Sequence, residues 1–401
     1  MPWQEQSTMA LKQEFVILAA QEGANLTALC ARFGISRPTG YTWLRRYQAQ
    51  GVAGLAEQSR APASSPGQTD PVVEAAVLAL RDRHPAWGGR KLRARLAALG
   101  AAGDPAGVVA PPAASTITAI LRRHARLDPA EAAKHTAWTR FEHDAPNALW
   151  QLDFKGHVAL AGGGRCHPLT LLDDHSRFLL GLGAYPNERD ATVRAALEAA
   201  FRRYGLPARI LCDNTSPWGT PHAPRTPTAL GVWLLRLGVA ICHGRPRHPE
   251  TQGKAERFHR TLKAEVLRAA ADGGPAHRDL AAAQAAFDAW RAVYNLERPH
   301  EALGMTPPVH RYAPSPRPFP ARLPPVEYGP DDTVRAVHGG GQLSYRGRLY
   351  FVGQGLRGQR VALRPTTTDG VLAVYFCAHR VGLLDVRGPA SAILTDGDRA
   401  V

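Results

Sequence analysis

The sequence has few cysteines and no long apolar run. Its five cysteines are scattered without a Cys-x-x-Cys pair, so neither a disulfide framework nor a structural zinc site is supported. The Cys–His neighbours at 166–167 and 242–243 each supply two of the four ligands that zinc needs. No stretch approaches the roughly 18 apolar residues of a membrane span, and residues 1–15 mix Glu, Gln and Lys. We therefore expect a cytosolic protein with buried thiols.

Acidic residues are the minority among the charged ones. Lys and Arg number 49 against 34 Asp and Glu, which gives a formal net charge of +15 and a pI near 10.1. That charge predicts a polyanionic partner, with nucleic acid as the leading candidate. A chain of 401 residues fits roughly two to four domains. The 38 glycines and 33 prolines predict linkers between them.

The first 56 residues have the pattern of a helix-turn-helix DNA-binding domain. A glycine-containing turn ends at Ser36, which can cap a helix over residues 37–48. Tyr41, Leu44 and Tyr47 are expected to face a trihelical core. The alternative is a solvated three-helix module without a ligand. The residues left for DNA contacts are Arg37, Thr39, Thr42, Arg45 and Arg46.

A second helical domain, resembling a looser helix-turn-helix, is expected over residues 70–127. It follows a Ser/Pro/Gly/Gln-rich linker at 57–69. Helices are expected over 70–83, over 89–99, and from a cap at Ser115 to Arg126. The second of these helices is strongly basic, and we expect Arg90 and Lys91 to contact DNA.

From residue 147 the pattern changes to that of a mixed α/β domain, expected over 140–312. Three short strand-like runs precede an alternation of helix, strand, helix and strand, and two longer helices follow. The strands are expected over 149–154, 167–173, 178–185, 208–212 and 239–242, and the helices over 190–204, 228–237, 252–271 and 277–294. The proline-rich segment 307–325 is expected to be a tether. Five strand-like runs then predict a small β-barrel-like domain over 327–390.

Three acids lie where this fold can bring them together. Asp153 interrupts the apolar run LWQLDF, Asp213 ends the run ILC, and Glu256 falls in the first turns of the helix after Pro249. An unpaired carboxylate at the edge of a sheet core is costly. Carboxylates that converge repel one another, and hard divalent cations such as Mg²⁺ or Mn²⁺ bound between them offset this repulsion. Taken singly, each acid is better explained as a structural residue, such as a turn or cap group; the three together, beside a basic helix, favour catalysis.

The helix after Pro249 has an apolar face and a charged one. Ala255, Phe258, Leu262 and Val266 recur at helical spacing and are expected to pack inward. The alternative for the charged face is a solvated surface with Glu–Arg pairs of little consequence. The preceding loop, HGRPRHPETQGK, is suited to holding a phosphate backbone. The residues expected on the charged face, or beside it in the loop, are Lys254, Glu256, His259, Arg260 and Lys263.

In five ordered motifs the chain resembles the DDE-type insertion-sequence transposases, whose catalytic core is similar to retroviral integrase. The motifs are WQLDFKG, LLDDHSRFLLG, ILCDNTSPWG, HGRPRHPETQGKAERFHRTLKAEVL and YNLERPHEALGMTPP. The resemblance implies a ribonuclease-H-like core that cleaves and joins DNA with Mg²⁺ or Mn²⁺, two ions per site. It implies that Asp153, Asp213 and Glu256 are catalytic and metal-binding, and that Arg260 and Lys263 contact DNA.

The same resemblance implies partners and a location. Double-stranded DNA, as terminal inverted repeats and as target, is the expected partner, bound by a homo-oligomer in the bacterial nucleoid. Two rivals remain: a DNA-binding regulator of the same fold without activity, and a nuclease that only hydrolyses.

Three positions have competing interpretations. Glu250 follows Asp213 with 36 intervening residues and Glu256 with 42. The shorter gap is closer to integrase spacing, but the Gln-Gly-x-x-Glu context belongs to Glu256. Asn214-Thr215 replaces the family's usual Asn-Gly, so the turn has less freedom for positive φ. Asp173 and Asp174 are expected to be turn and sheet-edge groups rather than ligands.

Overall fold

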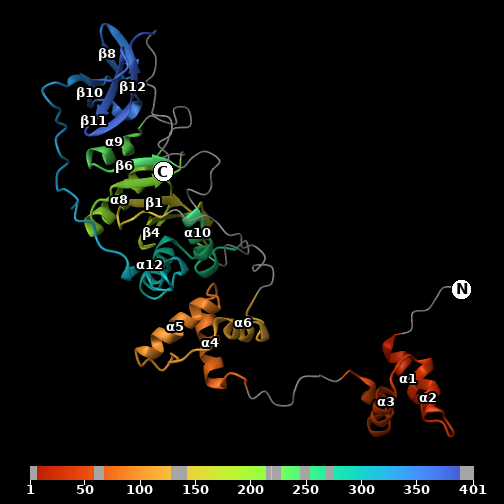
Figure 1. The fold of residues 1–401 in the computed structure, drawn as a ribbon. Helices are drawn as coiled ribbons and strands as arrows, with labels where there is room; N and C mark the ends of the chain where they lie inside the picture. Colours follow the sequence, from red (N-terminus) through yellow and green to blue (C-terminus); the bar gives the residue numbers. More distant parts are fainter. Residues whose placement is uncertain are drawn as a thin grey trace. The chain divides into compact units, whose positions relative to one another are not determined.

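The computed structural model describes residues 7–57, 67–127, 142–213, 218, 227–243, 253–267 and 274–388. The chain divides into two compact units, Met1–Gln68 and Thr69–Val401, and each is described by itself. Figure 1 labels their helices and strands. Among the residues described, no helix combines the length and the apolar character needed to cross a lipid bilayer.

The first unit is a small helical module. Its elements are α1 (Thr8–Ala19), α2 (Leu26–Arg32), α3 (Arg37–Gln50) and the 3₁₀ helix η1 (Gly51–Leu55). The predicted cap is confirmed, because the Ser36 side chain accepts a hydrogen bond from the backbone N–H of Thr39. Phe15, Cys30 and Leu55 are among the buried residues of its core.

The expected inward face of α3 is wrong at Tyr41, whose side chain is 46% exposed. Gly40 takes the inward position instead. A Cβ atom there would lie 2.5 Å from the Cys30 sulfur, so only glycine permits this close approach of α3 to α2. Leu44 and Tyr47 are partly buried against the same core, as expected. Tyr41 therefore lies on the exposed side of the helix.

The second unit begins with three helices, α4 (Pro71–Arg83), α5 (Gly89–Ala101) and α6 (Ala114–Arg123). Asp70 caps α4 by accepting from the Val72 N–H, which confirms that start. The predicted cap at Ser115 is wrong. The helix begins one residue earlier, at Ala114, and makes no side-chain cap hydrogen bond. A buried core that includes Val77, Leu80, Trp87, Leu92 and Ile117 joins the three helices.

A mixed sheet forms the centre of the second unit, in the order β2-β3-β1-β5-β6 with β4 paired to β3. The strands are β1 (Leu149–Phe154), β2 (Val158–Ala159), β3 (Arg165–Asp173), β4 (Leu179–Tyr185), β5 (Arg209–Cys212) and β6 (Ala240–His243). The predicted antiparallel trio is confirmed, since β3 pairs antiparallel with both β1 and β4. β5 pairs parallel with β1 and with β6. Strand β2 was not predicted.

Two apolar clusters pack against this sheet. Its helices are α8 (Asp190–Tyr204), α9 (Ala229–Arg236), α10 (Gly253–Glu265) and α12 (Leu280–Leu296). Trp150 and Leu152 of β1 join the cluster built with α8 and α9. The residues that alternate with them, Gln151 and Asp153, point to the opposite face. That face receives the cluster built with α10 and α12, which includes Phe258 and Phe287.

The proline-rich segment is a strap on the core rather than a tether. It contains η4 (Pro308–His310) and no strand or longer helix, as its composition predicts. However, Tyr312 and Phe319 pack against the central apolar cluster. The Arg317 guanidinium donates to the backbone carbonyls of Pro207, Leu237 and Gly238. Proline content excludes regular structure, but it does not prevent a segment from packing.

A small strand-rich domain ends the described chain. Its four-stranded sheet has the order β12-β11-β10-β7, and β8 pairs with β9 in a separate sheet. The elements are β7 (Thr333–Ala336), β8 (Gln342–Tyr345), β9 (Arg348–Phe351), η5 (Gln354–Leu356), β10 (Arg360–Pro365), β11 (Val371–Phe376) and β12 (His379–Asp385). Its apolar core includes Val232 and Leu235 from α9. The strands are therefore arranged as two sheets, packed on a helix of the central domain.

Candidate active site

Asp153 and Asp213 lie at the same end of two neighbouring parallel strands. In the register of β1 and β5, Gln151 is opposite Leu211. Asp153 lies two residues further along β1, and Asp213 directly follows β5. Adjacent strands are about 4.8 Å apart, and the charge of Asp213 acts on the Asp153 carboxyl, so the two acids lie near one another. The sheet register brings together acids that are 60 positions apart (213 − 153) in the sequence.

The electrostatics of this site connect all three predicted acids. The pKa of the Asp153 carboxyl is raised to about 7, first by burial and then by Asp213, with a smaller contribution from Glu256. Neighbouring negative charges that raise the pKa of a carboxyl indicate a site short of positive charge. Glu256 lies in the first turn of α10 with its side chain exposed. In the parts of the chain that the structure describes, no three His, Cys, Asp or Glu side chains are grouped closely enough to hold a metal ion.

Trp218 was not predicted as a site residue. Its indole N–H donates to the Asp213 carboxylate, and its ring is buried. The ring stacks on Phe154, with centroids 5.7 Å apart. The sequence contained a signal, an isolated aromatic in the polar run after Asp213, but propensity alone assigns no partner to it. Trp218 holds Asp213 and covers the end of β1.

His259 is buried, and the expectation that it shares the exposed face of α10 is wrong. Its side chain is 8% exposed, and Nδ1 lies 3.6 Å from Asp153 Oδ2. The Thr170 hydroxyl donates to the Asp153 carbonyl oxygen at 2.9 Å. His259 Nε2, 3.1 Å from that hydroxyl, is therefore the donor to it. Burial, followed by the charge of Lys155, lowers the pKa of His259 to about 3, so the ring is neutral at pH 7.

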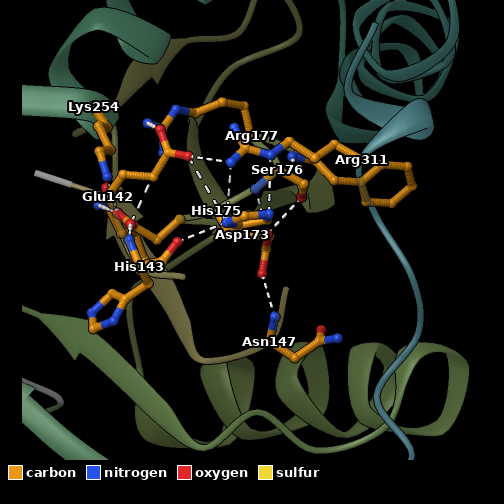
Figure 2. Close-up of polar contacts among 12 residues, drawn as sticks. Glu142, His143, Asn147, Asp173, His175, Ser176, Arg177, Lys254 and Arg311 are labelled. Carbon is orange, nitrogen blue, oxygen red and sulfur yellow. Dashed lines mark hydrogen bonds and ion pairs between the residues drawn. The ribbon is translucent and has the colours of Figure 1, made fainter. Parts of the chain in front are cut away.

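Lys254 is also turned inward. Its ammonium lies 2.5 Å from the Asp174 carboxylate, and Asp174 is fully buried. Asp174 further accepts hydrogen bonds from the backbone N–H of His143 and from the Gln151 side chain. Asp174 is therefore a buried counter-ion rather than a sheet-edge group. Figure 2 shows this contact at one side of a larger polar network.

The turn after β3 has a different role. Asp173 accepts from both the backbone N–H and the hydroxyl of Ser176, which confirms that Asp173 is a turn group. It also accepts from the backbone N–H of Asn147. Burial raises the pKa of Asp173 despite these bonds. The network continues through His175 and Arg177 of the turn itself, which contact Arg311 and Glu142 respectively. Arg311 and Glu142 also form an ion pair with each other.

Two predicted DNA contacts of α10 lie on its exposed side, namely Arg260 and Lys263. In α3, Arg37, Thr39 and Arg45 are exposed, whereas Thr42 and Arg46 are half-buried. The residues that differ most from expectation are therefore on α10.

The basic helix α5 packs against acids of its own unit. Arg90 forms an ion pair with Glu301, and Arg95 forms one with Glu297 at 2.5 Å. Burial lowers the pKa of Lys91 to about 8, helped by the charge of Arg298. Part of the positive charge of α5 is thus used within the protein.

The competing acid Glu250, the Asn214-Thr215 turn and most of the basic loop before α10 lie outside the described residues.

Family models match most parts of the chain. The integrase core domain matches residues 143–249 and, in a second model, 237–308. The C-terminal domain of IS481 family transposases matches residues 332–390. A helix-turn-helix domain matches residues 12–63, and a homeodomain-like domain matches 39–121.

Relatives include proteins of two insertion elements. A 31.7 kDa protein of IS407 from Burkholderia multivorans is 30% identical over 41% of this chain, which spans about half (54%) of that relative's length. A 39.2 kDa protein of IS476 from Xanthomonas euvesicatoria is 25% identical, over 72% of this chain and 78% of its own. The Gag-Pol polyprotein of avian reticuloendotheliosis virus is 28% identical over 32% of this chain and 11% of its own.

Solved structures with some similarity include the HTLV-2 integrase catalytic core domain in complex with magnesium. It is 15% identical over 43% of this chain and all of its own, with a TM-score of 0.33. A chain of the simian T-cell lymphotropic virus intasome is 17% identical over 74% of this chain and 99% of its own, with a TM-score of 0.35.

The domain models confirm the multidomain architecture: helix-turn-helix modules, a central integrase core and a small strand-rich C-terminal domain. Together with the insertion-element relatives, they confirm the resemblance of this chain to insertion-sequence transposases with a retroviral-integrase-like core.

Proposed function

We propose that this protein is a transposase that cuts DNA at the ends of an insertion sequence and joins the freed ends to target DNA. One observation carries the proposal: Asp153 and Asp213 are neighbours at the end of the central sheet, within the electrostatic reach of Glu256. This arrangement occurs in a chain with an integrase core and an insertion-element transposase domain.

The donor set fits hard divalent ions. Carboxylate oxygens are the ligands that Mg²⁺ and Mn²⁺ prefer. The pKa of Asp153 is raised by burial and by neighbouring negative charges, and a bound cation would offset both effects. Asp153 and Asp213 would hold the ions, with Glu256 as the third ligand from α10. Two such ions, when bound, activate an attacking oxygen and stabilise a leaving oxygen in phosphoryl transfer.

The surrounding residues orient these acids. His259 is neutral and donates through Nε2 to Thr170, so its Nδ1 carries no proton and the ring restricts the Asp153 carboxylate by contact rather than by a hydrogen bond. Trp218 donates to Asp213 and restricts its rotation. Arg260 and Lys263, exposed on α10, bind the phosphate backbone beside the reacting bond. The core thus positions the metal-binding carboxylates and also supplies contacts to the DNA substrate.

DNA ends are selected by the helical domains. In this proposal the domain at 1–56 contacts the terminal inverted repeat through α3, and the domain at 70–127 adds contacts from α5. The core at 140–312 does the chemistry, and the domain at 327–390 packs on helix α9 of that core. Pairing two DNA ends takes at least two protomers, so we propose a homo-oligomer on DNA.

A labelled-end assay tests the function. Duplex DNA that carries the element's terminal repeat is incubated with protein and Mg²⁺ or Mn²⁺, together with target plasmid. The proposal expects both nicked ends and joined products. Binding without cutting would instead identify a regulator, and nicking without joining would identify a nuclease that only hydrolyses.

A further inference from the structure

Glu256 lies between two buried polar contacts of helix α10. Lys254 precedes it by two residues and His259 follows it by three. Both side chains point inward to the sheet, whereas the Glu256 side chain is exposed.

The first contact ties α10 to the beginning of β1. Lys254 Nζ lies 2.5 Å from Asp174 Oδ1, and the same oxygen accepts from Gln151 Nε2 at 2.8 Å. The backbone N–H of Asp174 donates to the carbonyl of Leu149. Asp174 is fully buried, so its position relative to β1 is fixed by the sheet.

The second contact ties the helix to the other end of the same strand. His259 bonds the Thr170 hydroxyl, which is opposite Asp153 in the register of β1 and β3. Gln151 and Asp153 are two residues apart on β1 and share one face of the sheet. The helix therefore crosses that face with an anchor on each side of Glu256.

We propose that the ion pair between buried Asp174 and partly buried Lys254 sets the position of α10 on the sheet, and with it the position of Glu256 relative to Asp153 and Asp213. This inference rests on the proposed function. Asp174 and Lys254 are positioning residues, and Lys254 acts here through Asp174 rather than on DNA. A buried ion pair adds little net stability, but its geometry is specific. A displacement of the helix by even one ångström would misplace the third acid.

The two roles open to Lys254 predict opposite effects of Asp174→Asn. If Lys254 contacted phosphate, loss of its counter-ion would leave DNA binding unchanged or stronger. If the pair positions α10, then Asp174→Asn and Lys254→Met produce the same defect, and the double variant is no worse than either single one.

The test uses the full chain and three variants: Asp174→Asn, Lys254→Met and the double variant. Mn²⁺ alone is titrated in a calorimeter, and the Mg²⁺ concentration for half-maximal nicking is measured in parallel. We expect each variant to bind Mn²⁺ about ten- to a hundredfold more weakly, the usual effect of losing a residue that orients metal ligands. DNA affinity is expected to stay at the wild-type value.

Arg298→Met is the matched control. Arg298 forms a buried ion pair with Glu265 at the opposite end of α10, with side chains 4% and 5% exposed. Glu265 is nine residues (265 − 256) beyond Glu256, about 13.5 Å along the helix. This variant should lose thermal stability without a change in Mn²⁺ affinity, which separates positioning from general destabilisation.

The outcomes are distinct. Wild-type Mn²⁺ affinity in the single and double variants, additive defects, or an equal loss in Arg298→Met would overturn the inference and leave the proposed function intact. If a single variant fails to fold, the measurement is made on the double variant, which removes both charges of the pair and leaves Arg177, the other ion-pair partner of Asp174, paired with Glu142. Absence of Mn²⁺ binding and of nicking in the wild type would overturn the proposed function itself.

Discussion

Helices α3 and α10 are both basic, yet the structure places their charges differently. In α3, Arg37 and Arg45 are exposed on the side that carries Tyr41. In α10, Lys254 and His259 turn inward to Asp174 and Asp153, and Arg260 and Lys263 remain outside. A basic helix can therefore serve as a binding surface, or can use part of its charge to position a site within its own domain.

The largest effect on activity is expected from a change to Asp153, the acid beside the inward-facing His259 of α10. Asp153→Asn should reduce Mg²⁺-dependent nicking to the level without metal, because it removes a ligand charge at the centre of the proposed site. Gel-shift affinity for terminal-repeat DNA should not change, since α3 lies in the other compact unit. Normal nicking by this variant would remove Asp153 from the mechanism.

The exposed side of α3 gives the next effect. Arg37→Ala and Arg45→Ala should each weaken DNA binding and lower the slope of log affinity against log salt by about 1. Nicking at saturating DNA should be retained. An unchanged salt slope in both variants would show that this face does not meet phosphates.

A change at His259 tests whether the inward-facing residues of α10 stabilise their own unit rather than bind DNA. His259→Phe should destabilise the second unit by about 1–3 kcal/mol, because the Thr170 hydroxyl loses its donor and Asp153 a polar neighbour. Urea unfolding measures this loss. The slope of log DNA affinity against log salt should remain at the wild-type value. A reduced slope would show that His259 contacts DNA after all.

The smallest effect is expected from Lys91 on the basic helix α5, and it concerns the pH dependence of stability. Its pKa in the folded protein is about 8, below the ordinary 10.5, because burial disfavours its charge. Between pH 8 and 10.5 the unfolded chain holds this proton and the folded protein does not, so stability should rise with pH in that window, by roughly 1–2 kcal/mol after allowance for solvent. Lys91→Gln should remove this rise in unfolding measurements made across the window.

Several local signals in the sequence predicted their elements well, although the one at Ser115 did not. Strand β1 and helix α8 have the bounds expected. Ser36 and Asp70 cap α3 and α4 at the predicted helix starts. The mixed α/β class of the central domain followed from the order of its strands and helices, and its integrase-like core followed from the family resemblance.

The sequence did not predict the direction of polar side chains on helices. Periodicity assigns a face, but it does not say whether the partner of that face is solvent or a buried carboxylate. Lys254 and His259 look like surface cations until Asp174 and Thr170 are known to lie opposite them. Likewise, Gly40 could not be chosen over Tyr41 without the close approach of Cys30.

The strap and the tryptophan contact depended on tertiary structure as well. Arg317 bonds three carbonyls in two separate loops. Trp218 donates to Asp213 and stacks on Phe154 of β1, a residue 64 positions (218 − 154) away in the sequence. No pattern within either segment encodes those partners.

The most direct test of the central claim is a calorimetric Mn²⁺ titration of the wild type beside Asp153→Asn, Asp213→Asn and Glu256→Gln, with Glu250→Gln as the control. We predict that the wild type and Glu250→Gln bind Mn²⁺ alike, and that each of the other three variants loses most of the Mn²⁺ binding. Equal Mn²⁺ affinity in all five proteins would contradict it.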